Sequence, residues 1–352
     1  MNMTTSYLTA FFSSLLITYV LVPVVKKAAP KIGALDLPDE RRLNTEAIPN
    51  IGGLAIYLGF IVAVLLTAEI SPVFKGIMFG GTFILFVGFV DDLYEISPFW
   101  KLMGQIIAAI ILILYGVQIE FITNPMGGLL YLGYWSVPIT ILWVVSITNT
   151  LNLIDGLDGL ATGITVIAVF TLFFVSLQEG QPNSAILALS LAGAAFGFLK
   201  YNFPPAELFM GDSGAMFMGF VLAAISIAGA LKSAATVTLV VPLLALGVPI
   251  FDTLFAIIRR LYNGKPIGKA DQGHIHHRLL ALGWSQEEAV LIVYVISFLL
   301  GLTALAINGT SFGNSLVLII VVFGLLVYAA WKIGIFDVEL SPEGKTVEES
   351  KF

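Results

Sequence analysis

Two aspartate segments place carboxylates where they could handle a metal ion or a proton. Asp91 and Asp92 are adjacent at the end of an apolar stretch, in GFVDDLYEISP. Adjacent carboxylates repel each other and are costly to remove from water, so the pair indicates metal or proton handling, with a solvated helix end as the alternative. Asp212, in FMGDSG, could cap a helix, but it also suits a magnesium–phosphate complex. Capping does not explain Asn202 and Phe209 ahead of it.

A second group combines amides with carboxylates. Asn149, Asn152 and Asp155 are spaced three residues apart, so on a helix they share one face. Asp158 follows, and the glycine after each aspartate lets the backbone approach a ligand closely. With no Lys or Arg nearby, these groups indicate a cation or a hydrogen-bonding ligand. Polar contacts between helices are the alternative.

The three histidines of the chain lie within four positions, at His274, His276 and His277, and Arg278 follows them. A zinc site would need a more usual ligand spacing, and no cysteine is available to complete it. Lysines at positions 265 and 269 add positive charge to the same segment. We therefore expect this segment to bind an anion.

Two further features leave their alternatives open. Arg41 and Arg42 suit phosphate binding and equally suit an ordinary cytoplasmic signal of membrane topology. Asp252 lies about two turns inside an apolar stretch, and a carboxylate within a membrane is a functional-site hypothesis by default. The sequence does not assign it a role.

The elements that position these residues must be membrane helices. The chain is 58% hydrophobic and 11% charged, whereas a soluble domain carries about 25% charged residues. Too little polar surface remains for a water-soluble globule. The absence of cysteine excludes disulfides and thiolate metal sites. The stretch at 7–25 has no basic segment before it, so we expect a first membrane-spanning helix and not a removable signal peptide.

Apolar stretches long enough to span a bilayer recur along the chain. A spanning helix needs about 20 mostly apolar residues. We expect an all-α polytopic membrane protein with about eleven transmembrane helices. The stretches are 7–25, 51–70, 73–90, 99–118, 133–149, 159–178, 184–200, 213–231, 234–258, 288–308 and 314–333.

Charge sets the orientation, because Lys and Arg stay on the cytoplasmic side. With the N-terminus outside and the C-terminus cytoplasmic, all 17 basic residues except Lys75 and Lys232 lie inside. All 23 acidic residues except Glu69, Glu120 and Glu179 also lie inside. Carboxylates contribute little to topology, so this second bias needs another cause, and a cytoplasmic polar site would supply it.

The chain divides into a membrane domain and a tail. Residues 1–335 form a transmembrane catalytic domain, and the polar tail at 336–352 is predicted to be disordered. The cytoplasmic loops carry the motifs described above. They are expected at 26–50, 91–98, 150–158, 201–212 and 259–287.

The surplus of carboxylates and amides favours Mg²⁺, with Mn²⁺ as a substitute. Mg²⁺ prefers oxygen ligands and binds through one or two carboxylates plus substrate phosphates. Phosphoryl transfer uses such a metal ion together with basic groups and an aligned nucleophile. A site just inside one membrane face can receive one water-soluble and one lipid-borne substrate.

In their order along the chain, the motifs VDD, NLIDGLDGLA, FMGDSG and HIHHRL closely resemble the polyprenyl-phosphate N-acetylhexosamine-1-phosphate transferase superfamily. The resemblance runs from about Asp36 to Arg278. This superfamily includes the enzyme that makes lipid I of peptidoglycan. It also includes the enzymes that start O-antigen, enterobacterial common antigen and teichoic acid.

The resemblance implies a role for each motif. Asp212 would be the principal Mg²⁺ ligand with Asn152 as the second, and Asp91 and Asp92 would lie near the metal and the lipid phosphate as catalytic residues with Asp212. The other residues would bind the sugar nucleotide. Asp155, Asp158, Asn202 and Phe209 would surround the nucleoside, and His274, His276, His277 and Arg278 would contact the diphosphate and the sugar. Asn149 is a further expected substrate-binding residue.

The resemblance also implies the reaction. A UDP-N-acetylhexosamine would donate its sugar 1-phosphate to undecaprenyl phosphate, with release of UMP, at the cytoplasmic face of a bacterial inner membrane. The histidine motif reads HIHHR and not the HHHFE form of the muramyl-pentapeptide branch, which favours UDP-N-acetylglucosamine. Asn44 and Asn50 stand where the family often has His and Arg, which puts a phosphate role for them in doubt. The expected partners are both substrates, the bilayer and a second copy in a homodimer, without nucleic acid.

Two rival interpretations remain. The muramyl-pentapeptide branch would use the same fold with a larger sugar nucleotide. An ion-coupled transporter would place polar groups near the membrane midplane on broken helices. The carboxylates instead cluster at the inner ends of the apolar stretches, and only Asp252 lies deep.

Overall fold

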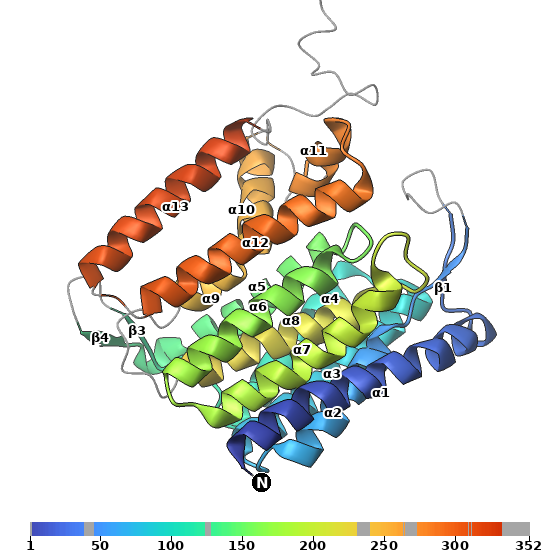
Figure 1. The fold of residues 1–352 in the computed structure, drawn as a ribbon, viewed down its shortest axis with the longest axis horizontal. Coiled ribbons are helices and arrows are strands. Elements are labelled where there is room, and N and C mark those ends of the chain that lie inside the picture. Colours follow the sequence, from blue (N-terminus) through green and yellow to red (C-terminus); the bar gives the residue numbers. More distant parts are fainter. Residues whose placement is uncertain are drawn as a thin grey trace, which may run out of the picture.

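A computed structural model of the protein describes residues 2–38, 46–123, 128–230, 240–262, 264, 273–308, 310 and 312–332. Nearly all of its regular structure is helical, with two short antiparallel strand pairs, β1–β2 and β3–β4 (Figure 1). In chain order the elements are α1 (Met3–Ile32), β1 (Leu35–Asp36), β2 (Ile48–Pro49), α2 (Gly53–Thr67), α3 (Pro72–Tyr94), α4 (Pro98–Leu114), β3 (Phe121–Thr123), β4 (Leu129–Tyr131), the 3-10 turn η1 (Gly133–Trp135), α5 (Ser136–Ile154), α6 (Leu160–Gln178), α7 (Pro182–Asn202), α8 (Gly211–Ala230), α9 (Val240–Ala245), α10 (Gly247–Tyr262), α11 (Ile275–Ala281), α12 (Gln286–Asn308) and α13 (Phe312–Lys332).

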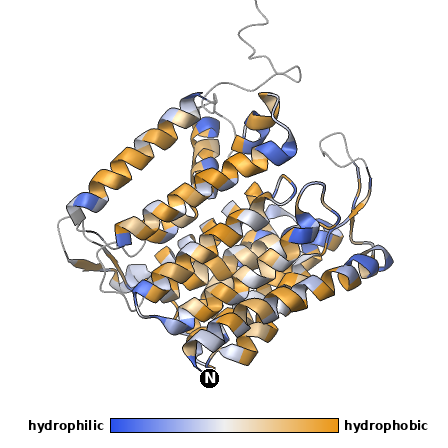
Figure 2. Ribbon diagram, viewed as in Figure 1, coloured by the Kyte–Doolittle hydropathy of each residue, from blue (hydrophilic) through white to orange (hydrophobic). Residues whose placement is uncertain are grey.

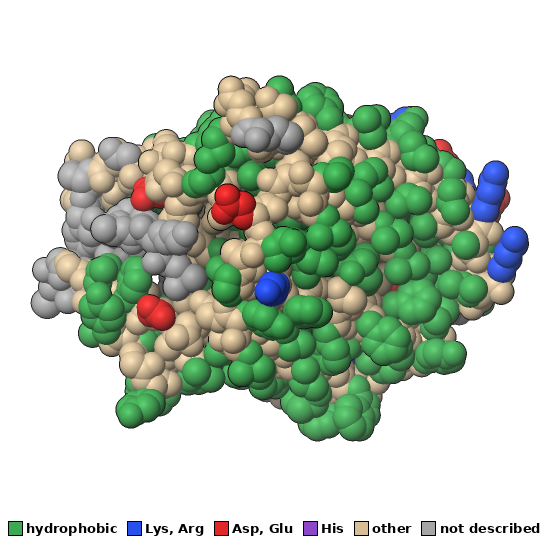
Figure 3. All heavy atoms as spheres, turned by 90° about the horizontal axis from the view of Figure 1, so that it is seen from below, with side chains coloured by type: hydrophobic (Ala, Val, Ile, Leu, Met, Phe, Trp, Pro, Cys, Tyr) green, Lys and Arg blue, Asp and Glu red, His purple; other side chains and the backbone are tan. Residues whose placement is uncertain are grey.

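Each of the eleven predicted apolar stretches overlaps a helix of this structure. Within the described residues, 7 helices are long and apolar enough to cross a membrane, and α2, α4 and the Gly313–Ala329 part of α13 form shorter apolar helices. Hydrophobic residues run along most helices, while hydrophilic residues gather near their ends (Figure 2). One lateral face is covered largely by hydrophobic side chains, with Lys and Arg at its edge (Figure 3). The chain is an all-α polytopic membrane protein, as its composition predicts.

The expectation of one helix at 234–258 is wrong, because the structure has α9 and α10 with a turn at Leu246 between them. Pro249 gives the physical reason. In a continuous helix its nitrogen would donate to the carbonyl of Ala245, but proline has no N–H. Residues 234–239 lie outside the described part of the chain.

Two helices also extend further than expected. α3 continues to Tyr94, so Asp91 and Asp92 lie in its last turn instead of beginning a loop. α5 continues to Ile154, which places Asn152 inside the helix. The predicted loops at 91–98 and 150–158 are therefore shorter in the structure. The polar tail at 336–352 and the segment with Arg41, Arg42 and Asn44 lie outside the described residues.

α8 lies at the centre of the bundle and packs on α3 and α5. Its Met216, Phe217 and Phe220 have no exposed surface. Glycines bring the helix axes close together. A Cβ added at Gly88 of α3 would lie 2.5 Å from the Cα of Ser213, and one at Gly219 would lie 2.8 Å from the Cα of Thr148. This close packing places the last turns of α3 and α5 beside the first turn of α8.

Gly219→Ala tests the close approach of α8 to α5. The added methyl group would meet the backbone of α5, and overpacking of a tight interface costs about 1–3 kcal/mol. We expect a lower unfolding temperature in detergent. Gly229→Ala on the same helix is the matched control, because an added Cβ there meets no atom within 4 Å. Equal unfolding temperatures for the two variants would contradict this packing.

Candidate active site

A cavity of about 1310 Å³ opens where the ends of α1, α3, α5 and α7 meet the starts of α4 and α8. The same end of the bundle carries the β1–β2 pair and α11 (Figure 1). Residues from all the sequence motifs contribute to its wall. The predicted site residues that line it are Asp91, Asp92, Asn152, Asp155, Asp158, Asn202, Phe209, Asp212 and His277. Asn149, His274, His276 and Arg278 do not line it.

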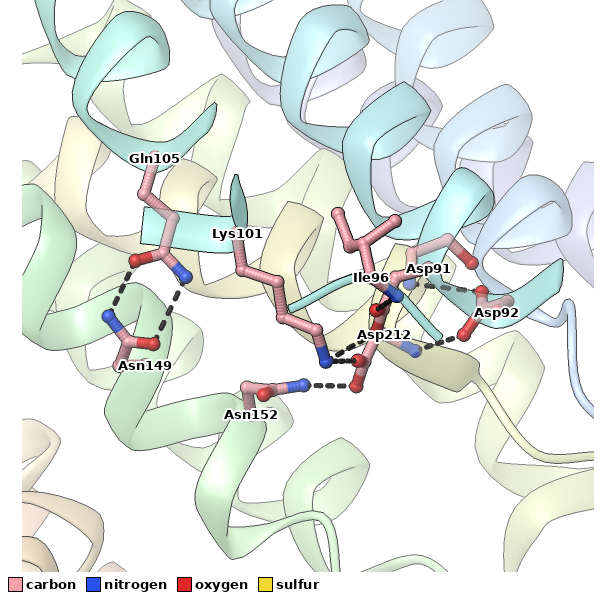
Figure 4. A network of polar contacts seen from close by, with 9 residues as sticks. Asp91, Asp92, Ile96, Lys101, Gln105, Asn149, Asn152 and Asp212 are labelled. Atoms are coloured by element: carbon pink, nitrogen blue, oxygen red, sulfur yellow. Dashed lines mark hydrogen bonds and ion pairs between the residues drawn. The ribbon is translucent and has the colours of Figure 1, made fainter. Parts of the chain in front are cut away.

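Asp212 lies at the centre of a polar network in this wall (Figure 4). Asn152 Nδ2 donates a hydrogen bond to Asp212 Oδ1 at 2.6 Å. Lys101 Nζ lies 2.6 Å from Asp212 Oδ2 and also forms an ion pair with Asp91. α3, α4, α5 and α8 therefore meet through one carboxylate. The residues predicted to be closest to a metal ion lie within hydrogen-bond distance of one another.

The sequence interpretation used Lys101 only as a basic residue at an inner helix end. In the structure its ammonium group joins Asp91 to Asp212. The available signal was its position in the first turn of a helix that follows the aspartate pair after a short turn. Antiparallel neighbours joined by a short turn place such residues side by side. Lys101 is therefore a further residue of this site, beyond the predicted set.

The adjacent aspartates have different surroundings. Asp91 is buried, and its carboxylate accepts the backbone N–H of Ile96 at 2.9 Å beside Lys101. Asp92 instead accepts the backbone N–H groups of Asp212 and Ser213, at 2.6 and 3.1 Å. Asp92 thus caps α8 from another helix, where its negative charge faces the positive end of the helix dipole. Capping was the alternative considered for Asp212, and Asp92 performs it.

Gly211 makes this cap sterically accessible. Its φ of +70° is in the left-handed region that favours glycine. A Cβ at this position would lie 2.6 Å from both carboxylate oxygens of Asp92. The glycine before the motif aspartate therefore serves the contact between α3 and α8.

Asn149 is placed differently from the other predicted site residues. It forms a reciprocal amide pair with Gln105, with N–O distances of 3.0 and 2.5 Å (Figure 4). Its Nδ2 also donates to the carbonyl of Val145. This is the polar contact between helices that was the alternative for its motif. It joins α4 to α5 just behind Lys101 and Asn152, and it stabilises the relative position of those two residues.

The loop between α5 and α6 is tied to the loop before α8. Asp158 Oδ2 accepts the backbone N–H of Ala206 at 2.9 Å. Asn202 donates to the carbonyl of Leu208 at 3.1 Å and accepts from the hydroxyl of Thr162 at 2.7 Å. These two predicted substrate-binding residues therefore also fix the shape of the cavity wall.

Asp155 is the carboxylate most strongly affected by its surroundings outside the membrane helices. Burial raises the pKa of its carboxyl group well above the usual range. The negative charges of Asp212, Asp92 and Asp158 raise it further. This side chain is therefore suited to sharing or holding a proton, or to facing a donor on a ligand.

The first loop of the chain is bound to the Asp212 motif through the backbone. Phe209 donates its N–H to the carbonyl of Pro49 and accepts the N–H of Gly52, both at 2.9 Å. Gly53 donates to Met210 at 2.8 Å. The half-buried Phe209 ring is thus held by the segment that also contains Asn50, and both residues line the cavity.

The histidine segment reaches the cavity through His277. The rings of His276 and His277 are 4.2 Å apart between centroids. A Cβ added at Gly156 would lie 2.7 Å from His276 Nε2, so this histidine packs against the loop that carries Asp155. Burial, and then the charge of His277, lower the pKa of His276 to about 3. His276 is therefore a neutral imidazole, and Arg278 beside it is buried.

The residues around Asp212 are compatible with a magnesium ion. Within the described ranges, no group of three or more His, Cys, Asp or Glu side chains is arranged to hold a metal ion. Mg²⁺ does not require such a group, because one or two carboxylates suffice when substrate phosphates complete the coordination. Asp212 and Asp91 supply two carboxylates, and Asn152 supplies an amide whose oxygen can face the same point after rotation. Oxygen donors of this type suit Mg²⁺ better than zinc.

Comparison with known proteins agrees with these motifs. A family model described as glycosyl transferase family 4 matches residues 74–230. The chain is 38% identical to a "probable undecaprenyl-phosphate N-acetylglucosaminyl 1-phosphate transferase" of Bacillus subtilis, over 95% of this chain and 94% of the relative. It is 35% identical to a decaprenyl-phosphate N-acetylglucosaminephosphotransferase of Mycobacterium tuberculosis, over 80% and 77%. It is 29% identical to a phospho-N-acetylmuramoyl-pentapeptide-transferase of Clostridium botulinum, over 83% and 92%.

The similarity to the Bacillus subtilis relative extends over almost the whole of both chains, so it includes every motif that lines the cavity. The chain belongs to glycosyl transferase family 4, among the polyprenyl-phosphate N-acetylhexosamine-1-phosphate transferases that its motifs resemble.

Proposed function

We propose that this protein transfers N-acetylglucosamine 1-phosphate from UDP-N-acetylglucosamine to undecaprenyl phosphate. An oxygen of the lipid phosphate forms a bond to the sugar-bearing phosphorus, and the bond from that phosphorus to the bridging oxygen breaks. The products are UMP and undecaprenyl-diphosphate-N-acetylglucosamine. The supporting observation is the meeting of Asp91, Lys101, Asn152 and Asp212 in one cavity wall at the ends of the membrane helices.

Each cavity residue has a distinct task in this reaction. Lys101 carries positive charge next to Asp212, where it can contact a phosphate oxygen of either substrate. Asp212, Asp91 and Asn152 would hold Mg²⁺, which neutralises negative charge on the transferred phosphoryl group when it is bound. A phosphate monoester has its second pKa near about 6 and is largely a dianion at neutral pH. Positioning of the lipid phosphate therefore matters more than removal of a proton from it.

The nucleotide end of the cavity is formed by the loops around Asp155, Phe209 and His277. The ring of Phe209 offers a face on which a base can stack, and the carboxyl group of Asp155 faces the same cavity. His277 would contact the diphosphate or the sugar from the opposite loop. The segment of Phe209 is bound to the first loop by backbone hydrogen bonds, and the loop of Asp155 is bound to it through the Asp158 carboxylate and the N–H of Ala206. The spacing of these two loops is therefore largely set before a substrate binds.

Two observations favour N-acetylglucosamine over the muramyl-pentapeptide sugar. The histidine motif, HIHHR, differs from the muramyl form HHHFE at its second, fourth and fifth positions. The Bacillus subtilis and Mycobacterium tuberculosis relatives, both named for N-acetylglucosamine transfer, are 38% and 35% identical to this chain, against 29% for the muramyl-pentapeptide transferase, although a Yersinia pestis relative named for the same sugar is 24% identical.

Release of UMP from a panel of sugar nucleotides tests the reaction. With undecaprenyl phosphate and Mg²⁺, we expect UDP-N-acetylglucosamine to have a kcat/KM at least tenfold above that of UDP-N-acetylmuramyl-pentapeptide. Equal turnover of both substrates would contradict the sugar assignment. Lipid-independent release of UMP would contradict the transfer, and solute uptake without any UMP release would favour a transporter.

Asp212→Asn tests the metal assignment. The amide retains the shape of the side chain but loses the negative charge, so we expect kcat to fall at least 100-fold and EDTA to abolish turnover in the parent enzyme. Binding of Mn²⁺, followed by electron paramagnetic resonance, should weaken in the same variant. Glu120→Gln changes a carboxylate in the segment between α4 and β3, away from the cavity wall. It is the matched control and should keep parental activity and Mn²⁺ binding. EDTA-insensitive turnover would refute a metal requirement.

We propose that the cavity faces the cytoplasm of a bacterial inner membrane, with an outside N-terminus and eleven spans, one of them formed by α9 and α10 together. Most Lys and Arg residues lie in the segments at the cavity end of the helix bundle. Basic residues gather in this way on the cytoplasmic side of membrane proteins. The fully exposed Tyr134 marks the opposite end of the bundle. The two ends differ in the way that this orientation requires.

Because the chain contains no cysteine, single cysteines can report its orientation directly. In intact cells we expect a membrane-impermeant maleimide to label Tyr134→Cys, and to label Lys31→Cys only after the membrane is permeabilised. The reverse pattern would invert the topology. Labelling of both positions from one side would contradict the placement of the cavity at a single membrane face.

A further inference from the structure

Asp252 is a buried carboxylate outside the cavity wall. It lies in the second turn of α10 and is 3% exposed. Its Oδ2 is 2.7 Å from His274 Nδ1, and its Oδ1 accepts the backbone N–H of Ile275 at 2.8 Å. Both oxygens therefore contact the start of the histidine segment. The sequence alone gave this carboxylate no role.

The two contacts define where α11 begins and how its first histidine is oriented. His274 is the residue before α11, and its own side chain makes no capping hydrogen bond. The carboxylate of Asp252 satisfies a free N–H of the first turn in its place. The bond to Nδ1 requires that His274 carry a proton on that nitrogen, since a carboxylate only accepts. With a proton fixed on Nδ1, the tautomer of the ring is set by this contact.

From His274 the contacts continue to the cavity. Its ring is parallel to that of His276, with an interplanar angle of 1° and centroids 5.7 Å apart. His276 contacts Gly156 and lies against His277, which lines the cavity. A change in the plane of the His274 ring would therefore disturb His276, because these two rings are buried and parallel, and His276 in turn packs against His277.

We propose that Asp252 is a positioning residue for the histidine segment. It fixes the tautomer and ring plane of His274 and the first turn of α11, and so holds His277 against the cavity. The expected effect on catalysis rests on the proposed function. The orientation of His274 by Asp252 does not depend on it. Outer partners that orient a metal-bound histidine contribute about 10- to 100-fold to activity, and we expect an effect of that order for this histidine segment.

Asp252→Asn is the discriminating variant. The amide oxygen can still accept the N–H of Ile275, but its NH₂ group would face His274 Nδ1. His274 must then offer a lone pair on Nδ1 and carry its proton on Nε2. With only three histidines in the chain, selective ¹⁵N labelling gives three ring systems to follow by NMR in nanodiscs. We expect one ring, identified by its loss in His274→Gln, to change from Nδ1–H to Nε2–H in Asp252→Asn.

A double-mutant cycle measures the consequence for transfer. We expect Asp252→Ala and His274→Ala each to lower kcat at least tenfold, with a smaller change in KM for UDP-N-acetylglucosamine. The double variant should be no worse than either single variant, because both changes remove the same interaction. Glu288→Gln is the control, since this carboxylate also caps a helix, at Ser285, but contacts no histidine. It should retain kcat within about twofold.

The outcomes separate this inference from the proposed function. An unchanged His274 tautomer in Asp252→Asn, or losses that multiply in the double variant, would overturn the positioning role. Asp252→Asn keeps the shape of the side chain, so it remains informative if Asp252→Ala fails to fold. If the parent protein released no UMP from any sugar nucleotide, the proposed function would fail, whereas the NMR result would still decide the contact.

Discussion

The candidate site depends on the neutralisation of carboxylates gathered at the end of a membrane bundle. Asp91, Asp92 and Asp212 come from helices that packing brings together, and their like charges would otherwise repel at short range. Lys101 compensates by pairing with Asp91 and Asp212. The backbone N–H groups at the start of α8 compensate Asp92. The tight packing of α3, α4 and α8 is therefore compatible with a strongly acidic cavity wall.

These two kinds of compensation also divide the aspartate pair by task. Asp92 accepts hydrogen bonds from backbone N–H groups, and these bonds hold the first turn of α8 in place. Asp91 is paired with a flexible ammonium group that a substrate phosphate could also engage. Asp212 lies between them and receives Lys101 and Asn152 on its two oxygens. Of the three, Asp91 and Asp212 are the carboxylates whose partners can exchange without unfolding a helix.

The sequence predicts the helices and many of the polar residues that line the cavity, for physical reasons. Long apolar stretches have few alternatives to helices in a membrane. Polar residues at the ends of those stretches must then lie near a membrane face, so Asp155, Asp212 and His277 could be expected together. The same reasoning missed the break at Pro249, because a 25-residue apolar stretch looks continuous by composition. It also assigned the last turns of α3 and α5 to loops, although the structure has them in the helices.

What the sequence could not predict is which polar group pairs with which. Asn149 shares a helix face with Asn152, yet it faces Gln105 while Asn152 faces Asp212. The two residues are about one helical turn apart along α5. The positions of α4 and α8 decide which neighbour each side chain contacts. Lys101 and Asp252 were visible as charges, but their partners lie on other helices. Which polar side chains pair with each other depends on how the helices pack, so the pairs can be identified only in the structure.

The positions of the polar contacts explain how a membrane bundle can hold a precise site without a large soluble domain. Each loop in the cavity wall is fixed by contacts to an element distant in sequence: the first loop to Phe209, the α5–α6 loop to Ala206, and the histidine segment to Asp252. Helices set the positions of the loop ends, while these bonds set the shape between them. A cavity built in this way keeps its acidic wall on rigid helix ends and the proposed nucleotide end on tied loops. That division suits a reaction in which a lipid phosphate and a soluble nucleotide must meet at one phosphorus atom.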